Sequence, residues 1–158
     1  GCNISWDTTL RIAAEIPNII GIKEASGNLN QCVKILRDRP EGFLVISGDD
    51  ALTLPLLACG GDGVISVVAN AFPKEFVSMV ACCLENNYIA ARSINQKMAD
   101  IIETIFADGS PSGVKAALEV LDLCQSHVRL PLVKVNKATF NNISSAIQMF
   151  ETSKISVL

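Results

Sequence analysis

The chain has 158 residues, of which 49% are hydrophobic and 18% charged, and its formal net charge is -3. This size fits one ordinary domain or a portion of a larger one, and the apolar content is too high for a disordered chain. No block of like charge occurs, so neither nucleic-acid binding nor a polybasic membrane patch is expected. No apolar run reaches the roughly 18 residues of a membrane span. The first residue, Gly1, does not open a signal peptide, and a start without Met suggests a chain cut from a longer protein.

The six cysteines do not follow the spacing of a metal site. No two of them are separated by two residues, and His127 is the only histidine. A zinc site with two cysteines and two histidines is therefore excluded for this chain. We expect reduced thiols in a cytoplasmic protein, and no metal.

The first part of the chain alternates helical segments with three β-branched apolar runs. The expected strands are residues 18–23, 43–47 and 64–68, and the expected helices are residues 5–15, 29–39 and 51–59. Apolar runs of this kind are typical of strands buried on both faces of a parallel sheet, and their spacing fits strand–helix–strand units. Asn28 is expected to cap the second helix.

After residue 72 the strand pattern disappears and helical patterns continue to the end. Helices are expected at residues 73–84, 88–106, 112–124 and 137–152, with an extended loop at residues 129–136. We therefore predict an α/β region at residues 1–85 and a helical domain at residues 86–158.

Three parallel strands with helices form either a small open sheet or the last part of an eight-stranded barrel, which takes about 250 residues. In both architectures functional sites lie at the carboxyl ends of the strands. Those ends are Lys23, Gly48 and residues 68–70, and Lys23 is the only nucleophile among them.

Lys23 is the first candidate for chemistry. A lysine whose stem lies among apolar side chains loses part of its preference for the charged form, and it can then attack a carbonyl and form a Schiff base. The alternative is a lysine that simply extends into solvent at a strand end. Strand alternation sends Glu24 to the opposite face of the sheet.

The other candidates are better explained by structure than by chemistry. Asp49 and Asp50 invite an acid–base interpretation, but a helix cap is favoured because they come just before a helix. Residues 60–63 form a glycine-rich turn without nucleotide-binding spacing. His127 is expected on the surface, and Tyr88 is expected to pack rather than to transfer protons.

Read together, the strand ends resemble the 4-hydroxy-tetrahydrodipicolinate synthase (dihydrodipicolinate synthase) family. The matching segments are Gly21–Asn28 (GIKEASGN), Ser47–Asp50 (SGDD) and Gly63–Val67 (GVISV) with Asn70, and further similarity covers Gly1–Asn3 and Arg129–Leu132. The turn Ser110–Gly113 departs from the family's usual asparagine–proline turn, outside the chemistry.

The resemblance implies a class I aldolase-type lyase on a TIM (β/α)8 barrel. It would condense pyruvate with L-aspartate 4-semialdehyde in lysine and diaminopimelate biosynthesis. Lys23 would form the Schiff base, and the backbone at Gly48 and Ile65 would line the pyruvate pocket. The three strands would be the last three of the barrel, followed by the C-terminal helical domain. No metal or organic cofactor is implied, and the family commonly forms homotetramers.

The family's proton-relay tyrosine, its substrate-binding arginine and its paired threonines would all lie before Gly1. The chain is therefore expected to be a C-terminal portion with negligible activity alone. Two alternatives stay open. One is a sibling aldolase, such as an N-acetylneuraminate lyase or a keto-deoxy-sugar aldolase. The other is a non-catalytic half-barrel that binds a partner through its exposed strand edge.

Overall fold

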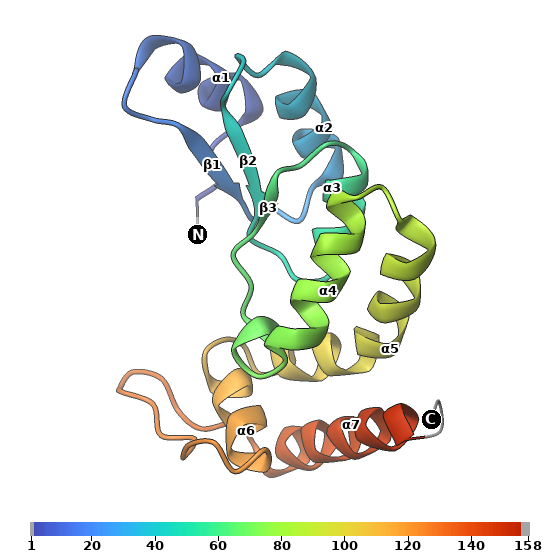
Figure 1. Ribbon diagram of the computed structural model, residues 1–158. Coiled ribbons are helices and arrows are strands. Elements are labelled where there is room, and N and C mark those ends of the chain that lie inside the picture. The colour runs from blue at the N-terminus through green and yellow to red at the C-terminus, as the bar shows by residue number, and fades with distance from the viewer. Residues whose placement is uncertain (1, 156–158) are drawn as a thin grey trace. The chain divides into compact units, whose positions relative to one another are not determined.

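The computed structural model describes the backbone of residues 2–155 and the side chains of residues 2–152. Gly1, which belongs to the similar segment Gly1–Asn3, therefore lies outside the described residues. The elements in chain order are α1 (Trp6–Glu15), β1 (Gly21–Glu24), α2 (Leu29–Asp38), β2 (Leu44–Ser47), α3 (Thr53–Ala58), β3 (Gly63–Val64), the 3-10 helix η1 (Val68–Asn70), α4 (Pro73–Leu84), α5 (Tyr88–Phe106), α6 (Ser112–Val120) and α7 (Lys137–Ile155). Figure 1 labels the strands and the α-helices.

The three strands form one parallel sheet in the order β1-β2-β3, as predicted. In its register Lys23 lies opposite Ile46, and Ile46 in turn lies opposite Gly63. The cap predicted at the start of α2 is also confirmed, because the Asn28 side chain accepts a hydrogen bond from the Gln31 backbone N–H at 3.2 Å. Strand, helix and strand therefore alternate as the apolar periodicity indicates.

Several predicted elements are shorter than expected: β1 begins at Gly21 rather than at residue 18, α3 covers only Thr53–Ala58, and β3 and α6 end early. The third strand ends at Val64, because after one more ladder bond, from the Ile65 N–H to the Ser47 carbonyl at 2.9 Å, the backbone turns toward η1. Helix α6 ends at Val120, four residues early. Asp122 adopts a left-handed φ of 56°, and the Leu123 N–H bonds back to the Leu118 carbonyl at 2.9 Å, which terminates a helix.

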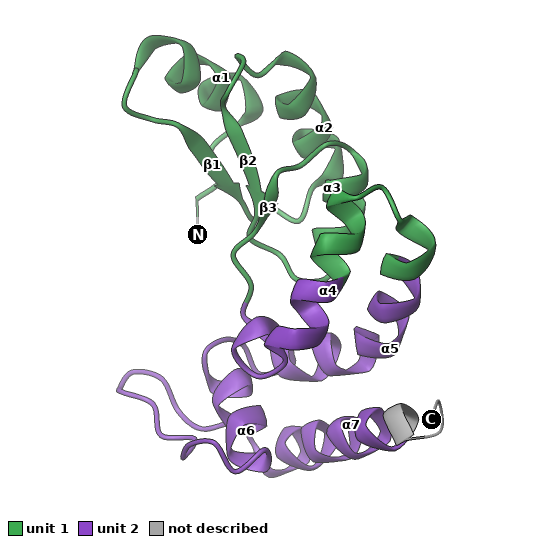
Figure 2. Cartoon of the chain, viewed as in Figure 1, with its two compact units in different colours: residues 1–66, 79–91 green, residues 67–78, 92–158 purple. Residues whose placement is uncertain are grey.

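The chain divides into two compact units (Figure 2). Unit 1 contains residues up to 66 together with 79–91, and unit 2 contains 67–78 together with the residues from 92 onward. Helices α4 and α5 each supply residues to both units. The domain boundary near residue 85 stays a prediction.

The core of unit 1 lies between the sheet and the helices that pack on it. Ile35, Phe43 and Val45 form its centre, and Trp6 and Ile22 pack against them. The opposite face of the sheet is open. Leu44 and Ile65 keep 40% and 56% of their surface exposed, so the predicted burial of the strands on both faces does not hold within this chain.

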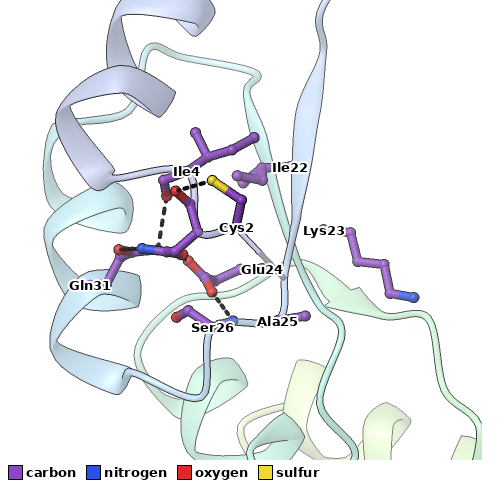
Figure 3. A pocket seen from close by; sticks show the side chains of 9 residues that line it. Cys2, Ile4, Ile22, Lys23, Glu24, Ala25, Ser26 and Gln31 are labelled. Carbon is purple, nitrogen blue, oxygen red and sulfur yellow. Dashed lines mark hydrogen bonds between the residues drawn. The ribbon is translucent and has the colours of Figure 1, made fainter. Parts of the chain in front are cut away.

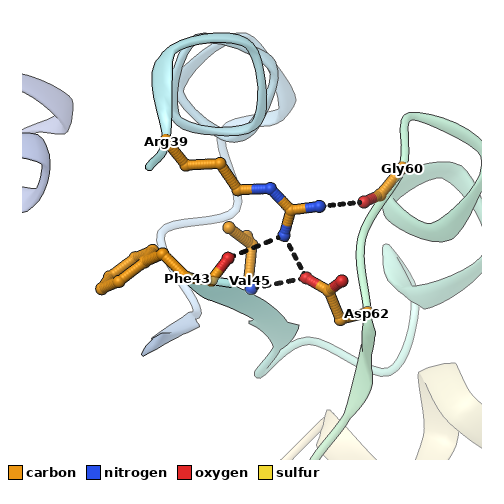
Figure 4. Close-up of polar contacts among 5 residues, drawn as sticks. All are labelled: Arg39, Phe43, Val45, Gly60 and Asp62. Carbon is orange, nitrogen blue, oxygen red and sulfur yellow. Dashed lines mark hydrogen bonds and ion pairs between the residues drawn. The ribbon is translucent and has the colours of Figure 1, made fainter. Parts of the chain in front are cut away.

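A polar cluster holds the amino end of the sheet together (Figure 4). The Arg39 guanidinium donates to the carbonyls of Phe43 at 3.0 Å and Gly60 at 3.2 Å, and it pairs with the Asp62 carboxylate. Asp62 also accepts a hydrogen bond from the Val45 N–H at 2.8 Å. The cluster ties the end of α2 to β2 and to the loop before β3. Gly60 has a φ of 99°, which only glycine adopts readily.

Unit 2 is helical. Helix α6 packs against α7 and η1. Phe72 and Phe150 meet edge to face, with ring centroids 5.6 Å apart, and the Ser112 hydroxyl donates to the Val133 carbonyl at 2.6 Å. Among the helices within residues 2–155, none combines the length and the apolar character that a bilayer crossing requires.

Candidate functional site

The structure brings the three predicted site residues to one end of the sheet. Lys23 is the third residue of β1, Gly48 directly follows β2, and Ile65 directly follows β3. The backbone fixes their neighbourhood, because the Gly48 N–H donates to the Glu24 carbonyl at 2.7 Å and the Ile65 N–H donates to the Ser47 carbonyl at 2.9 Å. All three therefore lie at the carboxyl ends of adjacent parallel strands, where sites in such folds are found.

Gly48 lies directly against the side chain of Lys23. A Cβ atom placed on Gly48 would come within 2.9 Å of Lys23 Cε and 3.0 Å of Lys23 Cγ, and within 2.7 Å of Ala25 Cβ. Real Cβ atoms do not approach so closely, so this position needs a residue without a side chain. The lysine stem thus runs along the backbone of the next strand, while the Lys23 side chain stays exposed.

Glu24 points to the other face of the sheet, as strand alternation predicts. It is only 4% exposed, and its carboxylate accepts hydrogen bonds from the Ser26 N–H at 2.6 Å and from Gln31 Nε2 at 2.7 Å. Figure 3 shows Lys23 extending away from this cluster. Adjacent residues therefore place a carboxylate inside unit 1 and an amine on its open face.

A pocket of about 440 Å³ borders the buried carboxylate. It is lined by the N-terminal segment, by β1 with the turn after it, and by Gln31 of α2. The Asn3 and Gln31 amides pair across its wall, with Asn3 Nδ2 donating to Gln31 Oε1 at 2.9 Å. Sequence reasoning missed both residues. The only sequence signal for them was the expected inward direction of Glu24, because a buried carboxylate needs a hydrogen-bond donor beside it.

The two neighbouring aspartates have separate partners. Asp49 accepts hydrogen bonds from the backbone N–H groups of Ala51 at 3.0 Å and Leu52 at 3.3 Å, just before α3. The predicted helix cap is therefore wrong: Leu52 occupies the cap position of α3 without a side-chain bond, and Asp49 closes the turn that precedes the helix. Asp50 is 1% exposed and accepts a hydrogen bond from the Ser66 hydroxyl, which links the loops that follow β2 and β3.

The remaining candidates take structural roles. The Tyr88 hydroxyl donates to the Leu57 carbonyl at 3.2 Å, and His127 is exposed, as predicted. All six cysteines are free thiols, and the described side chains, those of residues 2–152, include no group of three suited to hold a metal. Burial, together with the nearby Glu24 charge, raises the pKa of Cys32 to about 11, and burial likewise raises the pKa of Cys83.

Comparison with known proteins gives consistent matches over almost the whole chain. The model of the dihydrodipicolinate synthetase family matches residues 1–150. The 4-hydroxy-tetrahydrodipicolinate synthase of Azobacteroides pseudotrichonymphae genomovar. CFP2 is 44% identical over 152 residues, which cover 96% of this chain and 51% of that protein. The chain thus spans about half the length of the curated relatives it matches.

Solved structures agree with the sequence matches. The 4-hydroxy-tetrahydrodipicolinate synthase of Methylacidiphilum fumariolicum SolV has a TM-score of 0.93 and 32% identity, covering 98% of this chain and 52% of that chain. A chloride-inhibited dihydrodipicolinate synthase from Acinetobacter baumannii, solved in complex with pyruvate, has a TM-score of 0.90 and 32% identity, covering 94% of this chain and 51% of that one.

These matches confirm the predicted fold, which is the C-terminal part of a TIM barrel followed by a helical region. The three strands and the helices between them are the portion of the barrel that this chain contains. By its sequence, its fold and the segments at its strand ends, the chain belongs to the dihydrodipicolinate synthetase family.

Proposed function

We propose that the chain is part of an aldolase-type lyase of lysine and diaminopimelate biosynthesis, which joins pyruvate to L-aspartate 4-semialdehyde through a Schiff base on Lys23. One observation carries the proposal: the Lys23 side chain lies against Gly48 at the carboxyl end of the sheet, in a chain of this family. The pyruvate complex of the Acinetobacter baumannii relative supports pyruvate as the first substrate.

In the proposed reaction the Lys23 amine attacks the ketone carbon of pyruvate, and loss of one water leaves an imine. Removal of a methyl proton then gives an enamine, because the iminium nitrogen accepts the electron pair. The enamine carbon attacks the aldehyde carbon of the second substrate, and water later releases the lysine. The backbone at Gly48 and the Ile65 carbonyl would border the bound pyruvate. The proposed steps use no cofactor.

The chain alone is expected to turn over poorly. The lysine is exposed at an open sheet face, and proton transfer and substrate positioning each contribute orders of magnitude to such reactions. The chain spans about half of its relatives, so the groups for these tasks are assigned to the remainder of the barrel. Assembly as a homotetramer and a cytoplasmic location belong to the same proposal and rest on the resemblance.

Borohydride trapping tests the lysine directly. The 158-residue chain is incubated with pyruvate and borohydride, and peptide mass spectrometry locates any adduct with the mass of one pyruvate, less one water, plus one H2. We expect the adduct on Lys23, its loss in Lys23→Arg, and none with lactate, which has no ketone. Equal labelling of Lys23 and of the surface lysines, or none at Lys23, would contradict the proposal.

The exposed Leu44 and Ile65 favour a second candidate, a half-barrel that binds a partner without catalysis. The same trapping experiment separates the two, since the binding module predicts no specific adduct. A sibling aldolase would trap pyruvate equally well. It would differ in the aldehyde that discharges the enamine, so comparing L-aspartate 4-semialdehyde with N-acetylmannosamine distinguishes these enzymes.

A further inference from the structure

We propose that Glu24 is a positioning residue for Lys23: its buried carboxylate holds the turn after β1, and through that turn the residues against which the lysine side chain lies. This inference rests on the proposed role of Lys23. Glu24 is buried and directly follows Lys23 in β1, and none of the proposed reaction steps uses it. The inference gives this carboxylate a role.

Glu24 binds two segments that flank Lys23. Its backbone carbonyl accepts the Gly48 N–H at 2.7 Å, and its carboxylate accepts the Ser26 N–H at 2.6 Å. The first bond sets the position of Gly48 beside the lysine stem. The second closes the turn that contains Ala25, whose Cβ lies next to Gly48.

The carboxylate is itself held by a fixed donor. Gln31, which is 8% exposed, donates to Glu24 from Nε2 at 2.7 Å. The same amide is oriented by Asn3, because Asn3 Nδ2 donates to Gln31 Oε1 at 2.9 Å, and by the Ile4 carbonyl, which accepts from Nε2 at 3.3 Å. Gln31 therefore cannot turn its carbonyl toward Glu24 without losing these bonds.

The charge of Glu24 is balanced by neutral donors rather than by a cation. Within the described part of the chain, Glu24 takes part in none of the ion pairs. Burying a carboxylate in this way disfavours folding unless its hydrogen bonds are well formed, and an apolar residue would fill the same place at lower cost. A role in fixing the lysine explains why a carboxylate occupies this position.

Two variants separate geometry from simple loss of stability. In Glu24→Gln an NH2 group faces either the Ser26 N–H or the Gln31 NH2, so one of the two bonds is replaced by repulsion between donors. The double variant with Gln31→Glu restores a donor and an acceptor between the two side chains, but it loses the bond from residue 31 to the Ile4 carbonyl. Asp62→Asn is the matched control, because it disturbs a carboxylate that also bonds a backbone N–H in unit 1, at the other end of the sheet.

The first readout does not depend on pyruvate. Limiting acetic anhydride labels lysines in proportion to the accessibility and reactivity of each amine, and exposed Lys97 of α5 serves as the internal reference. We expect Glu24→Gln to change the Lys23:Lys97 labelling ratio at least about threefold, and trapping at low pyruvate to fall about tenfold, because a misplaced nucleophile loses orders of magnitude in rate. The double variant should return both values part of the way toward the wild type, because the bond to the Ile4 carbonyl stays absent.

An unchanged labelling ratio in folded Glu24→Gln would overturn the inference, as would an equal change in Asp62→Asn. If Glu24→Gln does not fold, Glu24→Asp, which keeps the charge but shortens the reach, must itself change the Lys23:Lys97 labelling ratio at least about threefold. A responsive labelling ratio without any pyruvate adduct in the wild-type chain would refute the proposed function and support the positioning role. The two failures are therefore distinguishable.

Discussion

The two ends of the three-stranded sheet are built differently. At the amino end, the side chains of Arg39 and Asp62 bind each other and the surrounding backbone. At the carboxyl end the carboxylates of Glu24 and Asp50 are also hydrogen-bonded within unit 1, but the open face is formed by backbone bonds and a glycine, and the Lys23 side chain on it is exposed. Both ends pair their buried carboxylates, whereas only the carboxyl end also presents an amine on the open face.

The difference follows the general organisation of parallel α/β proteins, in which the carboxyl ends of strands carry chemistry and the opposite ends carry stability. The ion pair of Arg39 and Asp62 lies at the amino end of the sheet, where no substrate is proposed to bind. Gly48 lies at the carboxyl end, where the absence of a Cβ leaves room for the Lys23 side chain to run along the neighbouring strand. Substitutions at the two ends should therefore have different consequences.

The largest expected effect comes from adding one methyl group at the carboxyl end. Gly48→Ala places a Cβ within 3.0 Å of the Lys23 stem and of Ala25, so the lysine must move. We expect the yield of trapped pyruvate on Lys23 to fall about 10- to 100-fold. Gly63→Ala is the matched control, because its nearest neighbour, Ile46 Cδ1, would be 3.8 Å away. Similar yields in both variants would remove the proposed importance of this contact.

The amino end should lose stability without losing chemistry. Asp62→Ala leaves the Val45 N–H and the Arg39 guanidinium without their carboxylate, which should lower the free energy of unfolding by about 1–3 kcal/mol. Urea unfolding of the variant and the wild type measures this change. Trapping on Lys23 should stay within about twofold when both proteins are folded. A loss of trapping as large as in Gly48→Ala would show that the two ends do not differ.

The smallest expected effect is a loss of stability at alkaline pH caused by Cys32. Its pKa in the folded chain is raised from 9.0 to about 11 by burial and by Glu24, so the unfolded chain ionises first as the pH rises. Stability from this group is complete below pH 9.0 and declines toward about pH 11. Urea midpoints across this range should decline less in Cys32→Ala, whereas Cys124→Ala, at an exposed thiol, should follow the wild type.

Adding Glu24→Gln sharpens this measurement. Because the Glu24 charge is the second cause of the raised pKa of Cys32, removing it should make the alkaline decline smaller and end it at a lower pH, while its onset stays near pH 9.0. An alkaline loss of stability that is the same with and without Glu24→Gln would contradict an effect of the Glu24 charge on the Cys32 thiol.

Much of this arrangement could be predicted from the sequence because it is local. The β-branched runs predicted the strands, and the period of α2 and its Asn28 cap predicted that helix. The positions of Lys23 and Gly48 at strand ends followed from the same runs. Their functional roles came from resemblance and stay proposals.

The rest depends on contacts between distant residues, which no local pattern encodes. Arg39 and Asp62 are 23 residues apart, and Asn3 and Gln31 are 28 residues apart. The early end of β3 also depends on contacts between distant residues. Residues 65–68 have strand propensity, but the chain leaves the sheet after the Ile65 N–H bonds to the Ser47 carbonyl. Tertiary geometry overrode local preference at that point.

The alternation of Lys23 and Glu24 also bears on how the sheet assembles. A slip of β1 by one residue against β2 would exchange the faces of the two side chains. The ammonium group would then enter the apolar core beside Val45, and the carboxylate would leave its donors for solvent. Both changes oppose the slip, so a pair of neighbouring charges makes misaligned pairing unfavourable during folding, and Lys23 helps to select the single strand alignment that its proposed role requires.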